Sequence, residues 1–121
     1  MNIDTRTAGD VQILDCRGSL TLGRGTKVLH DAVLSSLKTG RKAILLNLKE
    51  VDYVDSGGIG ELVSSLTTAM RQGGNLKLVN VSRKVQDVLS LAKAIDLFEL
   101  HYDEETALQS FTKAGSSNSG R

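Results

Sequence analysis

The sequence of 121 residues is poor in the side chains that disulfide, redox and metal chemistry require. Its single cysteine, Cys16, excludes an internal disulfide and lies in a strand-like run, where a free thiol usually behaves as a small buried apolar group. The chain has only two histidines, His30 and His101, and no residues with the spacing of metal ligands. We therefore expect no metal and no other cofactor.

Aromatic residues, an excess of one charge and long apolar runs are also missing. The chain has two Tyr, two Phe and no Trp, and 15 Lys and Arg against 14 Asp and Glu give a net charge of +1. Basic and aromatic residues do not cluster, so nucleic-acid binding has little support. No apolar run reaches the ~18 residues of a membrane span, and the start MNIDTRTAGD lacks the layout of a secretory signal. We expect a cytoplasmic protein without membrane insertion.

What the sequence does contain is an alternation of strand-like and helix-like segments. The run AILLNL at 43–48 is almost continuously apolar, which is typical of a central strand covered on both faces in a parallel sheet. The helix before it has apolar residues at 3.6-residue spacing, with Thr26 as its expected N-cap and Gly40 at its end. The further strands expected are 3–7 and 11–17 (a hairpin turning at Gly9-Asp10), 76–81 and 97–100. One further helix has its apolar stripe after Gly58, and two others start at Ser82 and at Asp103.

This alternation predicts one α/β domain over residues 1–113, with a mainly parallel sheet and right-handed crossovers. The remaining segment 114–121, AGSSNSGR, has no apolar residue beyond Ala114. We expect it to form a flexible tail, because such a segment cannot bury enough apolar surface to offset its ordering.

The stretch VDYVDSGGIGELV (51–63) places a serine and three glycines where a strand meets a helix. Serine at a helix start usually accepts a backbone N–H bond, which stabilises by about 1 kcal/mol over alanine, and capping is the interpretation of Ser56 that the local pattern favours. Gly57, Gly58 and Gly60 make a weak first turn, since glycine inside a helix costs about 1 kcal/mol relative to alanine. Their bare backbone allows another chain or an anion to approach closely.

A helix N-terminus favours phosphate, which here has two sources. One is a bound nucleotide, although GGIGE lacks the Lys-Ser/Thr ending of a P-loop. The other is phosphorylation of Ser56, which would add about −1.5 to −2 charges beside Asp55 and disturb a partner docked over the glycines. A serine hydrolase has little support, because a nucleophile elbow needs glycine two positions before the serine, where Val54 stands. We expect a protein that is not an enzyme.

Three blocks of the sequence resemble the STAS-domain anti-sigma factor antagonists, also called anti-anti-sigma factors. The blocks are LLNLKEVDYVDSGGIGELV (45–63), NLKLVNVSRKVQDVLSLA (75–92) and LFELHYDEETAL (97–108), and they follow the family's order. The resemblance implies a SpoIIAA-like STAS fold, in which a mixed, mostly parallel sheet of four to five strands carries about four helices.

The function that the resemblance implies is a phosphorylation-switched binding protein in transcription regulation. Unmodified family members bind an anti-sigma factor that is also a serine kinase, and this frees a sigma factor. The kinase phosphorylates the serine after the aspartate, binding is lost, and a serine phosphatase resets the switch. By position that serine is Ser56. The implied partner-binding residues are Asp55, Ser56, Gly57, Gly58, Ile59, Gly60 and Thr21. We expect the docking surface to consist of the 55–60 turn, the exposed side of the helix after it and the 19–25 loop.

Two positions depart from the family's pattern and keep an alternative open. Many switching members have serine or threonine where Gly57 stands, and an aspartate where Thr21 stands. The alternative is a non-switching STAS accessory or scaffold subunit of an ABC lipid-transport or stressosome-like complex. A third, more distant hypothesis is a small-ligand or nucleotide site on the backbone of 57–60.

Overall fold

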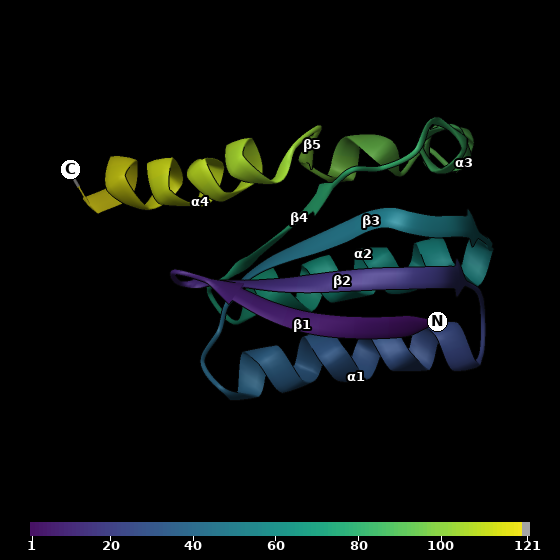
Figure 1. Ribbon diagram of the computed structural model, residues 1–121, viewed down its shortest axis with the longest axis horizontal. Helices are drawn as coiled ribbons and strands as arrows, with labels where there is room; N and C mark the ends of the chain where they lie inside the picture. The colour runs from purple at the N-terminus through teal and green to yellow at the C-terminus, as the bar shows by residue number, and fades with distance from the viewer. Residues whose placement is uncertain (120–121) are drawn as a thin grey trace.

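The computed structural model describes residues 1–119, and it gives the side-chain surroundings of residues 1–111. Within these residues a five-stranded sheet has the order β1-β2-β3-β4-β5 (Figure 1). The strands are β1 (Asn2–Ala8), β2 (Val11–Leu20), β3 (Ala43–Val54), β4 (Asn75–Val79) and β5 (Leu100–His101). β1 pairs antiparallel with β2, and every later pairing is parallel. The expected mainly parallel α/β domain with an N-terminal hairpin is confirmed.

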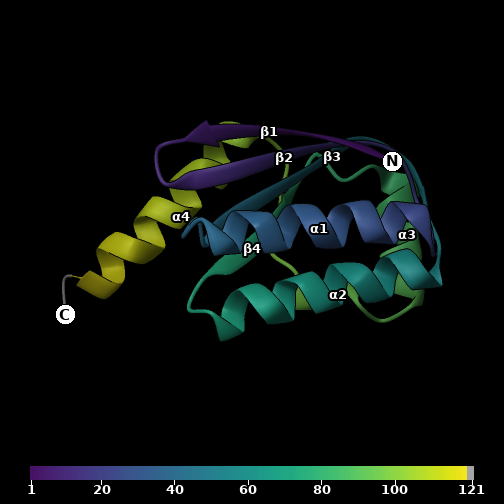
Figure 2. The ribbon, with the colours of Figure 1, turned by 90° about the horizontal axis from the view of Figure 1, so that it is seen from below.

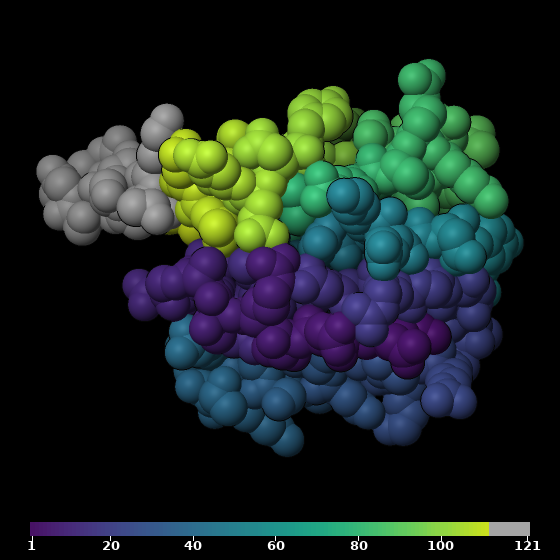
Figure 3. Space-filling view, viewed as in Figure 1, coloured from purple at the N-terminus to yellow at the C-terminus, as the bar shows by residue number. Residues whose placement is uncertain are grey.

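Helices cover the two faces of this sheet unequally. They are α1 (Arg24–Lys38), α2 (Ser56–Arg71), α3 (Arg83–Leu91), the 3-10 turn η1 (Ile95–Leu97) and α4 (Glu104–Ser119). α1 and α2 lie side by side along one face (Figure 2). α4 packs on the opposite face near the β1–β2 turn, and much of that face remains formed by β1, β2 and β3 themselves (Figure 3).

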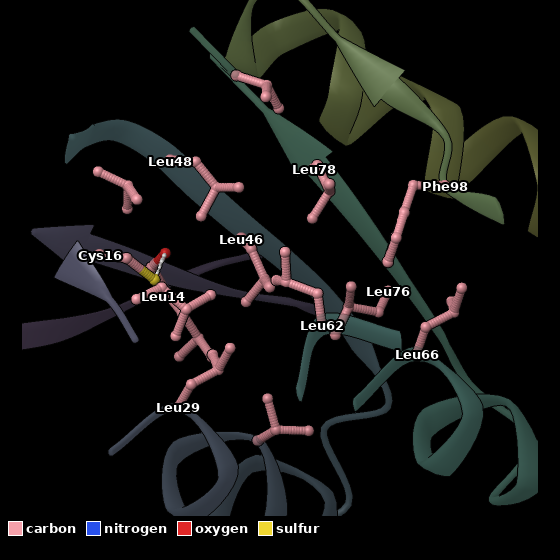
Figure 4. Close-up of a cluster of buried hydrophobic side chains, with 14 of the residues drawn as sticks. Leu14, Cys16, Leu29, Leu46, Leu48, Leu62, Leu66, Leu76, Leu78 and Phe98 are labelled. Carbon is pink, nitrogen blue, oxygen red and sulfur yellow. Dashed lines mark hydrogen bonds between the residues drawn. The ribbon is translucent and has the colours of Figure 1, made fainter. Parts of the chain in front are cut away.

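The larger core lies between the sheet and helices α1, α2 and α3. In Figure 4, Leu46 from β3, Leu62 from α2 and Leu76 from β4 point toward one another, and each is at most 1% exposed. Cys16 lies in the same core, and burial raises the pKa of its thiol to about 12. The expectation that this cysteine is a small buried apolar group is therefore confirmed. A smaller cluster, consisting of Val11, Ile13, Leu45, Val79 and Ala107, joins the other face to α4.

β3 extends well beyond the predicted 43–48. The prediction stopped short because the second half of the strand does not alternate like a regular strand. Its register against β2 shifts at two places along this extension. Each extra residue in a bulge resets which face the next side chain meets. As a result Leu48, Val51 and Val54 are all buried, with two exposed residues between successive members. The bulges carry the strand to the point where α2 begins.

Two of the predicted helix starts are confirmed. The Ser82 hydroxyl accepts the N–H of Val85 at 3.2 Å and caps α3. The Asp103 carboxylate accepts the N–H of Thr106 at 2.8 Å in front of α4.

The predicted cap of α1 is wrong. The cap is Gly23, and Thr26 instead occupies the third helical position, where its hydroxyl accepts the Gly23 N–H at 3.1 Å. The predicted strand 97–100 is also wrong over most of its length, because residues 95–97 form η1 and β5 contains only Leu100 and His101.

α4 continues to Ser119, so it includes most of the segment 114–121 expected to be a flexible tail. Residues 120–121 lie outside the described part of the chain. The boundary between a domain at 1–113 and a tail stays a prediction.

Candidate protein-docking site

The start of α2 is organised by Asp55, which is the N-cap of the helix. One of its carboxylate oxygens accepts the Gly58 N–H at 2.8 Å. Both oxygens accept the Leu22 N–H, at 3.1 and 3.2 Å, and the Asp55 N–H donates to the Leu20 carbonyl at 3.3 Å. A single carboxylate therefore joins the first turn of α2 to the loop between β2 and α1.

Ser56 is the first residue of α2 and not its cap, so the interpretation of this serine as a capping residue is wrong. Its N–H is one of the first donors of the helix, which have no partner inside the helix in any case. The residue is exposed, and within the described part of the chain its hydroxyl makes no hydrogen bond. The side chain is open to solvent at the positive end of the helix dipole.

The three glycines have different surroundings, and two of them are approached by this chain itself. A Cβ at buried Gly58 would overlap the Leu20 carbonyl oxygen, and a Cβ at Gly57 would lie 2.7 Å from the Cβ of Leu22. A Cβ at Gly60 would meet nothing within 4 Å, and this residue is exposed. The expected close approach is therefore made by the β2–α1 loop at Gly57 and Gly58, and only Gly60 presents open backbone.

The β2–α1 loop presents an apolar side chain beside Gly57. Leu22 is 77% exposed. Thr21 is half-buried, and its carbonyl accepts the Thr26 N–H at 3.1 Å, which holds the loop against the start of α1. Ile59 is partly buried and packs against the larger core. The predicted partner-binding residues thus gather in one place, but the sequence analysis did not name Leu22, the most exposed apolar side chain there.

Side chains around this turn make a mixed polar border. The Ser19 hydroxyl donates to Asp52 at 3.0 Å, and the Lys84 ammonium lies 5.8 Å from the ring centre of half-exposed Tyr53. Between α1 and α2, His30 Nδ1 lies 3.4 Å from a carboxylate oxygen of Glu61. This border carries both signs of charge.

Hydrogen bonding keeps the Asp55 carboxylate ionised. The N–H groups of Gly58 and then Leu22 hold the pKa of Asp55 below its ordinary value, because both bonds favour the charged form. This leaves a fixed negative charge directly beside the Ser56 hydroxyl.

Other kinds of site find little support in the described residues. Among residues 1–119, no group of three or more His, Cys, Asp or Glu side chains is placed to hold a metal ion. None of the helices in the same part of the chain is long and apolar enough to cross a membrane. The Gly58 N–H is already bonded to Asp55, so the 57–60 backbone offers an anion fewer free donors than a phosphate-binding loop needs.

Comparisons with known proteins point in one direction. A family model described as STAS domain matches residues 2–107. A Bacillus subtilis protein named anti-sigma-B factor antagonist is 32% identical over 110 residues, which is 90% of this chain and 98% of that relative. A Staphylococcus epidermidis protein of the same name is 26% identical over 109 residues, with the same coverage of both chains.

Solved structures with this fold include a Thermotoga maritima protein provisionally named an anti-sigma factor antagonist. It is 25% identical, with a TM-score of 0.83 over 91% of this chain and 94% of that chain. SpoIIAA in its unphosphorylated form is 13% identical, with a TM-score of 0.69 over 93% and 98% of the two chains. Phosphorylated SpoIIAA from Bacillus is 14% identical, with a TM-score of 0.68 over 90% and 99%. The SpoIIAA likeness concerns the fold alone, and it confirms the expected SpoIIAA-like arrangement.

Proposed function

The chain belongs to the STAS domain family, and from that premise we propose that it is an anti-sigma factor antagonist switched by phosphorylation of Ser56. The unmodified chain binds an anti-sigma factor that is also a serine kinase, and so frees a sigma factor for transcription. Phosphorylation ends the binding, and a serine phosphatase restores it. The chain works in the cytoplasm as a binding partner and carries out no chemistry of its own.

One observation carries this proposal: the Ser56 hydroxyl is exposed and is not needed by the fold. Because Asp55 is the N-cap of α2, modifying Ser56 breaks no capping bond. The helix N-terminus also tolerates an added anion, since its dipole favours negative charge. Phosphorylation can therefore occur on the folded domain without unfolding it.

The effect of the phosphate falls on the partner. A phosphoserine carries about −1.5 to −2 charges at pH 7 and lies beside the ionised Asp55 carboxylate. A protein surface that covers Ser56 must then remove water from a dianion next to a second negative charge, and burying unpaired charge is costly. Ser56 and Gly60 lie one helical turn apart on the same side of α2, so a partner that contacts the open Gly60 backbone also meets the phosphate.

The test uses the purified chain with each anti-sigma-type serine kinase encoded in its own genome. One of these kinases should bind the wild type and, with ATP, add one phosphate to the peptide containing Ser56, as measured by mass spectrometry. Ser56→Ala should keep the affinity and gain no phosphate, and Ser56→Asp should bind more weakly. Equal affinity for all three chains, or a phosphate elsewhere, would refute the switch.

The second candidate function is a non-switching STAS scaffold subunit. Its support is Gly57 and Thr21, the two positions that depart from the pattern of the family's switching members. A chain that co-purifies with an ABC ATPase or a stressosome-like assembly and keeps Ser56 unmodified would favour this candidate.

A further inference from the structure

Leu22 differs from an ordinary exposed leucine because the backbone around it is fixed. Exposed single apolar residues are common and need no explanation. Here, however, the Leu22 N–H is bonded to both oxygens of Asp55. The residue before it, Thr21, is bonded through its carbonyl to Thr26. The loop therefore holds a 77% exposed leucine in one position.

Leu22 lies against the first turn of α2 at Gly57. A Cβ built on Gly57 would lie 2.7 Å from the Cβ, 3.0 Å from a methyl carbon and 3.2 Å from the Cα of Leu22. Any residue other than glycine at this position would displace the loop, since real Cβ atoms essentially never approach below 3.0 Å. Gly57 is thus the residue that lets Leu22 lie here.

Resting on the proposed function, we infer that Leu22 is the apolar anchor of the docking site and inserts into an apolar pocket of the serine-kinase anti-sigma factor. Asp55 and Gly57 are its positioning residues: the first holds its N–H and the second makes room for its side chain. Binding energy is concentrated in a few central, preorganised side chains that enter desolvated pockets. Leu22 lies against Gly57, the residue that follows Ser56, so a partner that encloses this leucine also comes close to a phosphate on Ser56.

Binding to the kinase tests the anchor. In calorimetric titrations with the kinase that binds the wild type, Leu22→Ala should raise Kd about 10-fold to 100-fold, the value of an aliphatic side chain that becomes fully buried. Leu91→Ala is the matched control, because Leu91 on α3 is 85% exposed, and it should change Kd less than about 2-fold.

The outcomes separate this inference from the function it rests on. Equal Kd values for wild type and Leu22→Ala would overturn the anchor and leave the phosphorylation switch standing. A wild-type chain that binds none of the kinases would overturn both.

A double-mutant cycle tests the positioning by Gly57. Gly57→Ala and Leu22→Gly should each weaken binding, and the double variant should bind no more weakly than Leu22→Gly alone, because the overlap with Leu22 Cβ is gone. Losses that add in the double variant would show that Gly57 acts without Leu22, and would overturn this part.

The role of Asp55 has a test that needs no partner. Asp55→Asn retains a good N-cap residue but leaves one acceptor oxygen in place of two. In amide hydrogen exchange followed by NMR, the Leu22 N–H should lose protection severalfold, while the Val85 N–H, capped by Ser82, should be unchanged. Unchanged protection at Leu22 would overturn the positioning role of Asp55.

Discussion

Replacing Gly58 by alanine should destabilise the domain, although alanine is the better helix former. A Cβ at this position would overlap the Leu20 carbonyl oxygen and lie 2.9 Å from a methyl of Val54 and 3.0 Å from Leu20 Cγ. Overpacking costs about 1–3 kcal/mol, and a backbone carbonyl cannot rotate away, so the upper end applies. Alanine returns about 1 kcal/mol of helix propensity. The expected net loss is therefore about 2 kcal/mol in the free energy of unfolding.

Gly60→Ala is the matched control, two residues along the same helix. Its Cβ would meet nothing within 4 Å, so alanine should add about 0.5–1 kcal/mol of stability. Urea unfolding followed by circular dichroism measures both variants against the wild type. If Gly58→Ala were as stable as Gly60→Ala, the close packing of α2 on the end of β2 would be refuted.

Three further predictions concern side chains outside this packing contact. Ser56→Ala should change the free energy of unfolding by less than about 0.5 kcal/mol, and a loss near 1 kcal/mol in urea unfolding would instead identify Ser56 as the cap. The Arg6 guanidinium holds the pKa of Asp15 below its ordinary value. The stability that this pair contributes should therefore be complete above about pH 4 and be lost as the pH falls through the lowered pKa. Asp15→Asn should flatten that part of the stability–pH curve, and an unchanged curve would contradict the role of this ion pair. Because the pKa of Cys16 is raised to about 12, an alkylating reagent at pH 8 should label it only in denaturant, and rapid labelling of the folded chain would contradict its burial.

The sequence predicted the elements whose patterns are regular. Apolar spacing located α1 and α2, and the continuous run 43–48 located the centre of β3, because burial on one stripe or on both faces leaves a simple period. The second half of β3 has a period of three caused by bulges, and no simple strand pattern corresponds to it.

The helix caps were predicted less well where two residues compete for one role. Asp55 and Ser56 are both good N-cap residues, and the choice between them depends on the Leu22 N–H, which comes from a distant part of the chain. In the same way, Thr26 looked like a cap but bonds back to Gly23 from inside the helix. Local pattern contains no information on such contacts.

The candidate site shows the same limit. The sequence and its resemblance drew attention to residues 55–60, Thr21 and the 19–25 loop, and Asp55 joins the loop to the turn. Within that loop Leu22 was not singled out, because an isolated leucine in a loop can be buried or exposed. The glycine that departs from the family's pattern was the available clue, and its meaning became clear only when Leu22 was found against it.

The different roles of Asp55 and Ser56 have an evolutionary consequence. The Asp55 carboxylate caps α2 and holds the Leu22 N–H, whereas the adjacent Ser56 hydroxyl makes no hydrogen bond in the described part of the chain. Under the proposed switch, a descendant that lost Ser56 would keep an intact domain without kinase control, and one that regained it would become controllable again. Signal-responsive and constitutive members of such a lineage can therefore be a single codon apart.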